Sequence, residues 1–297
     1  MTETVLTGTV LKGIGGFYYV LGDDGAEYTL RAQSKIRHIH VKPMVGDRVE
    51  FVPGSGEEEG WLKSIQPRRT ELLRPPVSNI DAVVLTLAAS TPQADELLID
   101  RLMLFARGKN IACYLAVNKC DEDGDNAAFL AEQYRGACDG VFAVSAETGE
   151  GLDALRSALK GKIHAFAGQS GVGKSSLINA LYGFHLDTGS ISSRIERGKH
   201  TTRSSCLIPV DGGGSVLDTP GFSLLESEIM EPEKLQELYP EFLPYAGKCR
   251  FSPCMHDAEP DCAVKEALGG GLISRPRYER YRTLLAEMKE RWNKRYD

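Results

Sequence analysis

The strongest indication of this chain's architecture is the segment Gly168-Gln169-Ser170-Gly171-Val172-Gly173-Lys174-Ser175. It fits the phosphate-binding loop pattern, because an apolar strand is expected before it at 163–167 and Ser176 opens a helix expected over 176–181. Glycines let backbone N–H groups turn toward a phosphate, and the helix N-terminus adds a partial positive charge. Lys174 is expected to reach the terminal phosphates, and the Ser175 hydroxyl is expected to ligate Mg²⁺. A chance glycine-rich turn is the alternative, and the loop alone does not separate ATP from GTP.

The motif Asn118-Lys119-Cys120-Asp121 makes that separation, and all four residues lie ahead of the phosphate loop. The Asp121 carboxylate can accept hydrogen bonds from the N1–H and the exocyclic amine of guanine, which adenine does not supply. A buried carboxylate left unpaired by the wrong base is costly, so this residue favours GTP strongly. Asn118 would brace the base and the phosphate loop, and Lys119 belongs to the same nucleotide-binding set. An ATPase is the alternative that Asp121 opposes.

Two further motifs complete the predicted nucleotide site. Ser145-Ala146 ends a strand expected at 140–144, where a backbone N–H can contact the guanine O6. Asp218-Thr219-Pro220-Gly221 follows a strand expected at 215–217. Asp218 can therefore hold Mg²⁺ through water, and the Gly221 N–H can sense the γ-phosphate.

Between the phosphate loop and Asp218, the stretch 187–203 is rich in glycine, serine and charge without apolar periodicity. Such a stretch is typical of a switch segment that γ-phosphate and Mg²⁺ order. Thr202 is the preferred Mg²⁺-ligating threonine, and Thr201 is the second choice. Gly221 is followed by Phe222, whose apolar side chain cannot orient the attacking water. His200 is the candidate for that role, with an exposed loop histidine as the alternative.

The order of the motifs predicts a rearranged fold. Ordinary GTPases carry the phosphate loop first and the guanine motifs last, whereas here the guanine motifs precede 168–175. A circular permutation keeps the site and relocates the termini. Strands expected at 82–88 and 111–117, with a helix expected over 95–107 between them, predict a parallel α/β sheet whose ligands gather at the strand ends.

The N-terminal part reads differently, as short strands separated by glycine and aspartate turns. Strands are expected at 7–11, 17–21, 27–31, 48–52 and 60–65. This pattern predicts a small closed β-barrel, joined through a linker at 72–80 to the α/β part. Basic residues that few acids oppose cluster near the strand ends: Arg31, Lys35, Arg37, His38, His40, Lys42 and Arg48. A solvated loop face is the plain interpretation of this cluster, and an RNA-binding surface is the alternative.

Cysteines gather in the C-terminal part as Cys249-x₄-Cys254-x-His256-x₅-Cys262. Three sulfurs and one imidazole suit tetrahedral Zn²⁺, which would be structural because no coordination position stays open. Free thiols beside a histidine are the alternative. We expect the metal to stabilise a segment with a thin apolar core, followed by a basic helix over 277–296 that is solvated rather than RNA-binding.

The composition is that of an ordinary globular protein of 297 residues, with 42% hydrophobic residues, 26% charged residues and a formal net charge of -6. This net charge argues mildly against nonspecific binding along nucleic acid. Seven cysteines are an odd number for a disulfide framework, which favours a reducing compartment. The four cysteines outside the cluster are expected to be buried or semi-buried thiols: Cys113, Cys120, Cys138 and Cys206. No apolar run is long enough to span a bilayer. We therefore expect a soluble, cytoplasmic protein with no membrane partner, and a monomer.

Together, these motifs resemble the ribosome small-subunit-dependent GTPase A family, also called RsgA or YjeQ, over essentially the full chain. The resemblance rests on the motifs at 118–121, 168–175, 198–202, 218–221 and 249–262. It implies an OB-fold RNA-binding domain at 1–70, a circularly permuted GTPase domain at 71–226 and a helical zinc-binding domain at 227–297. It also implies GTP, Mg²⁺ and one Zn²⁺ as cofactors, and the small ribosomal subunit and its rRNA as partners. Lys199 and Arg203 depart from the family pattern beside the Mg²⁺ threonine.

From this resemblance we expect subunit-stimulated hydrolysis of GTP to GDP and phosphate during late small-subunit maturation. GTP and Mg²⁺ would order the switch, contact with the subunit would complete the catalytic site, and hydrolysis would release the protein. Lys174, Thr202 and His200 are the expected catalytic residues. The alternative is a GTP-regulated switch that binds RNA or protein at a non-ribosomal target.

Overall fold

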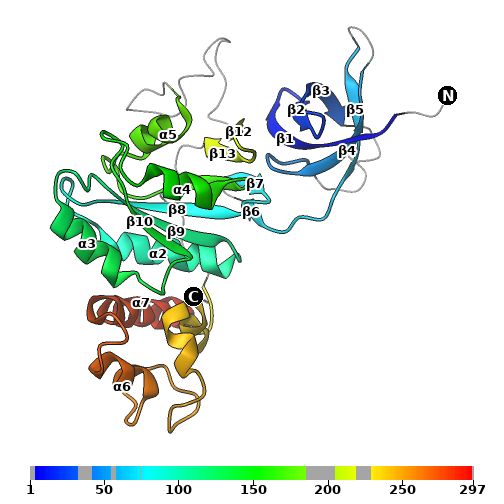
Figure 1. The fold of residues 1–297 in the computed structure, drawn as a ribbon. Coiled ribbons are helices and arrows are strands. Elements are labelled where there is room, and N and C mark those ends of the chain that lie inside the picture. The colour runs from blue at the N-terminus through cyan, green and yellow to red at the C-terminus, as the bar shows by residue number, and fades with distance from the viewer. Residues whose placement is uncertain are drawn as a thin grey trace. The chain divides into compact units, whose positions relative to one another are not determined.

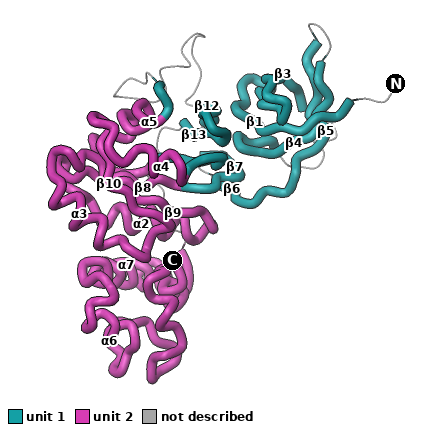
Figure 2. Tube along the Cα trace, viewed as in Figure 1, with its two compact units in different colours: residues 1–82, 159–166, 182–222 teal, residues 83–158, 167–181, 223–297 magenta. Residues whose placement is uncertain are grey.

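The structure is a computed structural model (Figure 1). Its chain divides into two compact units (Figure 2). It describes residues 4–32, 42–54, 58–73, 75–184, 205–218 and 229–295. The first unit consists of residues 1–82, 159–166 and 182–222, and the second of residues 83–158, 167–181 and 223–297. Within the described ranges, none of the helices has both the length and the apolar character needed to cross a membrane.

Five strands of the first unit close into a barrel in the order β1-β2-β3-β5-β4. They are β1 (Leu6–Ile14), β2 (Phe17–Gly22), β3 (Glu27–Ala32), β4 (Arg48–Val52) and β5 (Gly60–Ile65). Alternate apolar residues point inward and form the barrel core: Val10, Val20, Leu30, Val49, Phe51 and Leu62. The predicted closed barrel is confirmed, and each expected strand lies within an observed one because the period-2 pattern marks the buried face.

The segment predicted as a linker is a β-hairpin instead, so that prediction was wrong. β6 (Glu71–Leu73) pairs antiparallel with β7 (Pro76–Ser78). The buried Asp47 carboxylate fixes this hairpin to the loop before β4, because it accepts hydrogen bonds from Ser78 Oγ at 2.6 Å and from Arg68 Nε at 2.7 Å. The same carboxylate accepts the backbone N–H of Met44 at 2.7 Å. Prolines at 75 and 76 suggested an extended connector, but this polar network joins the segment to the barrel.

Six strands form a mixed sheet in the order β10-β9-β8-β11-β13-β12. Its strands are β8 (Ala82–Ala88), β9 (Ala112–Asn118), β10 (Gly140–Ala143), β11 (Ile163–Ala167), β12 (Cys206–Pro209) and β13 (Ser215–Asp218). β9 and β10 pair in parallel, as do β11 and β13, whereas β12 runs antiparallel to β13. Every residue of β8 is buried, as expected of a strand covered on both faces.

Four helices accompany the sheet: α2 (Glu96–Gly108), α3 (Gly124–Gln133), α4 (Leu152–Leu159) and α5 (Lys174–Tyr182). α2 begins where Asp95 caps it by accepting the N–H of Leu98 at 2.9 Å. α3 has an equivalent cap at Asp123, which accepts the N–H of Asn126 at 2.9 Å. The predicted α/β architecture is confirmed, and α2 differs from its expected range by one residue at each end.

The C-terminal part contains two 3₁₀ helices, η3 (Pro232–Leu238) and η4 (Pro240–Tyr245), and two α-helices, α6 (Ala263–Gly269) and α7 (Arg275–Asn293). It is mostly helical, as predicted. Its core is not thin, however, because a buried cluster spans η3, η4, α6, α7 and Leu104 of α2. Aromatic rings make up much of that cluster, with Tyr239, Phe242 and Tyr281 in mutual contact at centroid distances of 4.9–5.1 Å.

The boundaries predicted for three domains stay a prediction. The barrel, the hairpin and strands β11 to β13 belong to the first unit, whereas β9, β10 and the C-terminal helices belong to the second. The chain therefore leaves the first unit near residue 82 and returns to it twice. The three predicted domains are contiguous ranges, so they divide the chain differently from these two units.

Candidate nucleotide and metal sites

The phosphate loop follows β11 and ends in the first turn of α5, as its pattern predicts. Three glycines adopt positive φ angles there, Gly168 at 143°, Gly171 at 82° and Gly173 at 92°. A Cβ at Gly168 would lie 2.3 Å from the carbonyl oxygen of Thr86, and a Cβ at Gly173 would lie 2.3 Å from Asn118 Nδ2. Gly168 and Gly173 are therefore required by close packing as well as by backbone conformation, and Gly171 by its backbone conformation alone.

Lys174 curls back over this loop. Its ammonium group donates hydrogen bonds to the carbonyl oxygens of Gly168 at 2.8 Å and Gln169 at 2.7 Å. The side chain is half-buried, and this burial lowers the pKa of Lys174. Ser175 and Ser176 occupy the next positions of α5 and are partly exposed, whereas Val172 is buried beneath the loop and Ser170 is exposed. Lys174, Ser175 and Ser176 thus all belong to the first turn of α5.

Asn118 joins three of the predicted motifs. It ends β9, is 2% exposed, and donates from Nδ2 to the carbonyl oxygen of Val172 in the phosphate loop at 2.9 Å. Its Oδ1 accepts the backbone N–H of Ala146 at 3.1 Å. One amide side chain therefore holds the phosphate loop and the Ser145-Ala146 turn in a fixed relation.

The turn after β10 is held by its own serine. Ser145 is fully buried, and its hydroxyl accepts the N–H groups of Glu147 at 3.2 Å and Thr148 at 3.0 Å. Lys119 takes a left-handed backbone conformation with φ at 63°, and its ammonium donates to the carbonyl oxygen of Thr91. Asp121 lies two residues further on and is exposed. These positions leave the Asp121 carboxylate accessible beside an ordered turn.

Asp218 ends β13 in the first unit, where it pairs in register with Cys206 of β12. The carboxyl group is 3% exposed, and its Oδ1 has no hydrogen-bond partner within the described part of the chain. Burial raises the pKa of Asp218 to about 6. A buried carboxylate oxygen without a donor is a suitable acceptor for metal-bound water.

Several predicted residues lie outside the described residues: His200, Thr201, Thr202, Gly221 and Phe222, together with Lys199 and Arg203. The same holds for Lys35, Arg37, His38 and His40 of the predicted basic cluster. Two described members of that cluster are opposed by acids after all, because Arg48 pairs with Asp23 at 2.7 Å and Arg31 with Glu59 at 3.1 Å. The charges of Arg31 and Arg48 are thus partly neutralised, which the sequence did not indicate.

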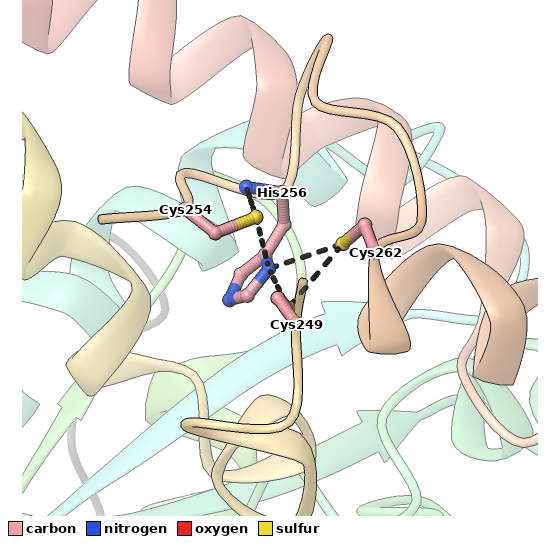
Figure 3. Close-up of side chains that lie close together, drawn as sticks. All are labelled: Cys249, Cys254, His256 and Cys262. Atoms are coloured by element: carbon pink, nitrogen blue, oxygen red, sulfur yellow. Dashed lines mark hydrogen bonds between the residues drawn. The ribbon is translucent and has the colours of Figure 1, made fainter. Parts of the chain in front are cut away.

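Cys249, Cys254, His256 and Cys262 converge in one cluster, and their ligand atoms all lie within 4.8 Å of one another (Figure 3). His256 Nδ1 is 3.5 Å from Cys249 Sγ, 3.4 Å from Cys254 Sγ and 3.2 Å from Cys262 Sγ. Cys249 Sγ and Cys262 Sγ are 3.8 Å apart. A zinc tetrahedron has edges of about 3.8 Å between sulfurs and about 3.6 Å between sulfur and nitrogen. The donor set and its spacing fit a Zn²⁺ ion bound through Nδ1.

Two tyrosines of α7 donate hydrogen bonds to the loop that carries these ligands. Tyr278 donates its hydroxyl hydrogen to the carbonyl oxygen of His256 at 2.7 Å, and Tyr281 donates to that of Met255 at 2.6 Å. Burial lowers the pKa of His256, which keeps the imidazole neutral as metal ligation requires. The other four cysteines are free thiols; three of them are buried and Cys138 is partly buried, as predicted.

The sequence pattern did not indicate the buried ionic network on α7. The helix was expected to be solvated, yet Arg277 is 2% exposed and donates to Asp100 Oδ1 at 2.6 Å and to Glu241 Oε1 at 2.7 Å. Its guanidinium also lies over the rings of Tyr134 and Tyr239, at 5.0 and 5.2 Å. The buried Asp100 on the apolar face of α2 was the available signal, because a buried carboxylate needs a cation.

Comparisons with known proteins agree with this geometry. A family model described as RsgA GTPase matches residues 65–228, and one described as RsgA N-terminal domain matches residues 7–62. The chain is 43% identical over 293 residues to a Small ribosomal subunit biogenesis GTPase RsgA from Caldanaerobacter subterraneus subsp. tengcongensis, covering 98% of each chain. It is 44% identical over 289 residues to a protein of the same name from Geobacillus thermodenitrificans, covering 96% of this chain and 98% of the relative.

Solved structures show the same architecture. YjeQ from Thermotoga maritima superposes with a TM-score of 0.82 at 33% identity, covering 96% of this chain and 99% of that one. YloQ, described as a circularly permuted GTPase, gives a TM-score of 0.81 at 33% identity over 97% of this chain and 96% of its own. The permuted motif order, the five-stranded barrel and the Cys₃His cluster occur here in one chain with these full-length similarities, and the chain therefore belongs to the RsgA GTPase family.

Proposed function

We propose that this protein binds GTP with Mg²⁺ at the motifs joined by Asn118 and hydrolyses it to GDP and phosphate when it meets the small ribosomal subunit. The observation that carries the proposal is the pair of Asn118 hydrogen bonds to Val172 and Ala146. Through them, the residues that read guanine and the loop that holds phosphate form one unit. Such preorganisation is what a nucleotide site needs before its ligand arrives.

Each motif has a separate role in this proposal. The loop 168–176 holds the phosphates, with Lys174 on the terminal ones, and Asp121 reads the base beside Lys119, Ser145 and Ala146. Mg²⁺ is held by Ser175 and Thr202, with Asp218 acting through water and Gly221 sensing the γ-phosphate. What supports the Asp218 assignment is its buried Oδ1, which has no donor among the residues that the structure describes.

Base recognition is tested by exchanging Asp121 for Asn. The variant should shift preference from guanine toward xanthine nucleotides, because the amide offers a donor where the carboxylate accepted. Asp125→Asn, in the exposed first turn of α3, is the matched control and should leave the preference unchanged. Unchanged preference in Asp121→Asn would favour the ATPase alternative.

His200 is proposed to orient the attacking water, because Phe222 cannot do so. We expect His200→Ala to lose at least about tenfold of the stimulated turnover while GTP affinity stays the same, in line with the contribution of a positioned side chain. Turnover equal to that of the wild type would remove His200 from the mechanism.

The Cys₃His cluster is proposed to hold one structural Zn²⁺. All four ligand positions would be filled by protein, so no chemistry is assigned to the ion beyond fixing the loop 249–262 against α7. Elemental analysis of the purified protein should give one zinc per chain, and Cys262→Ser should reduce that content.

The partner is proposed from the relatives, whose name specifies small ribosomal subunit biogenesis. One face of the barrel supports contact with rRNA, because basic side chains lie over aromatic rings there. Lys12 Nζ is 4.3 Å from the Tyr19 ring centroid, and Trp61 is 45% exposed. Arg31 is 4.5 Å from the ring centroid of Phe17, and its pair with Glu59 leaves Lys12 as the stronger phosphate contact. Aromatic rings beside cations can stack bases and neutralise phosphates.

A cytoplasmic monomer that acts in late subunit maturation completes this proposal. The rival is a GTP-regulated switch with a non-ribosomal target. Salt-dependent binding to any structured RNA, with no preference for the small subunit, would favour that rival.

A further inference from the structure

A buried ionic network connects α7 of the C-terminal part to the first two turns of α2. Asp100 is 1% exposed and receives two arginines, with Arg277 on Oδ1 and Arg280 on Oδ2, each at 2.6 Å. Arg280 also donates through Nη1 to the Glu96 carboxylate and, at 3.2 Å, to Gln133 Oε1. Tyr134 lies beneath both guanidinium groups and donates its hydroxyl hydrogen to the backbone oxygen of Glu96 at 3.2 Å.

Glu96 is the first residue of α2, so its position sets where the loop 89–95 joins the helix. This loop contacts the guanine motif, because Ala89 N–H donates to the Asn118 carbonyl oxygen at 2.8 Å and Thr91 accepts the Lys119 ammonium. It also lies against the phosphate loop, since a Cβ on Gly171 would be 3.7 Å from Pro92 Cδ.

We propose that Arg280 is a positioning residue for the nucleotide site, acting through Glu96 and the loop 89–95 on Lys119 and the phosphate loop. The C-terminal helix α7 thereby sets nucleotide affinity through an ionic contact that touches no nucleotide atom. The proposal rests on the nucleotide site proposed above. Its subject is the ion pair between α7 and α2, which lies outside the nucleotide site and holds it in position.

The geometry separates this contact from simple docking of the two helices. α2 and α7 share a second ion pair, Arg101 with Glu287, whose oxygen atoms lie 2.5 and 2.7 Å from the guanidinium nitrogens. That pair is more than one-third exposed on both sides and lies further along α2 from the loop 89–95. Arg280, by contrast, is 15% exposed at the side chain and reaches the residue that begins the helix. Loss of the Arg101 pair should loosen docking without displacing Glu96.

The test measures the dissociation constant and dissociation rate of a fluorescent GDP on the full-length chain with Mg²⁺. The variants are Arg280→Ala, Glu96→Ala, the double variant, and Arg101→Ala as the matched control. Each is measured well below its own melting temperature, because a merely structural role lowers stability without changing the affinity of folded molecules. We expect Arg280→Ala and Glu96→Ala each to raise the dissociation constant for GDP by about 2- to 30-fold, the usual range for residues that modulate a site from a distance.

The double variant should bind GDP no more weakly than the weaker-binding single variant, because both residues act through one contact. Arg101→Ala should stay within about twofold of the wild type. Coupling is reciprocal, so GDP should also slow amide hydrogen exchange in α7 of the wild type, and Glu96→Ala should remove that protection. If Arg280→Ala does not fold, Glu96→Ala and the exchange measurement decide the matter.

Wild-type affinity in Glu96→Ala, or equal weakening by Arg101→Ala, would overturn the positioning role. A wild-type chain that binds no fluorescent GDP would instead contradict the proposed function. The two failures are therefore distinguished by the first titration.

Discussion

Exchange of Asn118 for Ala should weaken both folding and nucleotide binding. The substitution removes two hydrogen bonds of a side chain that is 2% exposed. Asn118 Nδ2 donates to the Val172 carbonyl oxygen at 2.9 Å, and Asn118 Oδ1 accepts the Ala146 N–H at 3.1 Å. Each buried polar partner left unsatisfied costs about 1–3 kcal/mol. We therefore expect the free energy of unfolding to fall by about 2–4 kcal/mol, since Ala146 is only partly buried and water can satisfy its N–H in part.

The assay is urea unfolding with and without GDP. Because a bound ligand stabilises the folded state in proportion to the logarithm of its concentration over Kd, the gain from a fixed GDP concentration reports affinity directly. That gain should shrink in Asn118→Ala, since the phosphate loop and the Ser145 turn are no longer tied together. Thr148→Ala, in the same turn, removes only a 3.4 Å hydrogen bond on the surface and should change stability by less than about 0.5 kcal/mol. An Asn118→Ala protein with wild-type stability and an undiminished GDP effect would refute this reasoning.

Three further outcomes are expected. Zinc removal by a chelator should lower the melting temperature yet preserve the helical circular dichroism of α7, because the C-terminal part has a buried cluster of its own. Asp47→Ala should destabilise the chain by about 3–5 kcal/mol in urea unfolding, since it leaves Arg68 without its buried partner, whereas Arg250→Ala, which breaks an exposed pair, should cost at most about 1 kcal/mol. Burial lowers the pKa of His164 to about 4, so the folded state binds fewer protons than the unfolded state between pH 6.5 and pH 4. Stability should fall by about 3 kcal/mol as pH drops through that window, and His164→Gln should show a flatter pH profile.

Much of the fold could be predicted because its signals are local. The period-2 pattern fixed the strands of the barrel, with β4 and β5 bounded as expected, and the apolar run 82–88 coincides with β8. The phosphate-loop pattern and the Cys₃His spacing are also local. The structure has the phosphate-loop backbone where the pattern predicts it, and it brings the four Cys₃His ligands together in one cluster. Where the residues of a binding site lie close together in the chain, their spacing forms a motif from which the site can be predicted.

The missed features depend on contacts between distant residues. The hairpin at 71–78 has the prolines of a linker, and only Asp47, more than 20 residues away, explains why it is ordered. Arg277 and Arg280 have the sequence of a solvated helix, yet their partner Asp100 lies on α2, 177 and 180 residues earlier. A charge on a helix is expected to face water unless its buried counter-charge is known, and sequence spacing does not supply that partner.

The most direct test of subunit-stimulated GTP hydrolysis is the turnover rate of the purified protein, measured alone and with small subunits, large subunits or free rRNA at one stated salt concentration. Without a partner, the rate should lie near the ~10⁻⁴ to 10⁻³ s⁻¹ of an unassisted GTPase. We expect a large increase in this rate with small subunits only. Equal rates under all four conditions would contradict it and leave a GTPase whose target lies elsewhere.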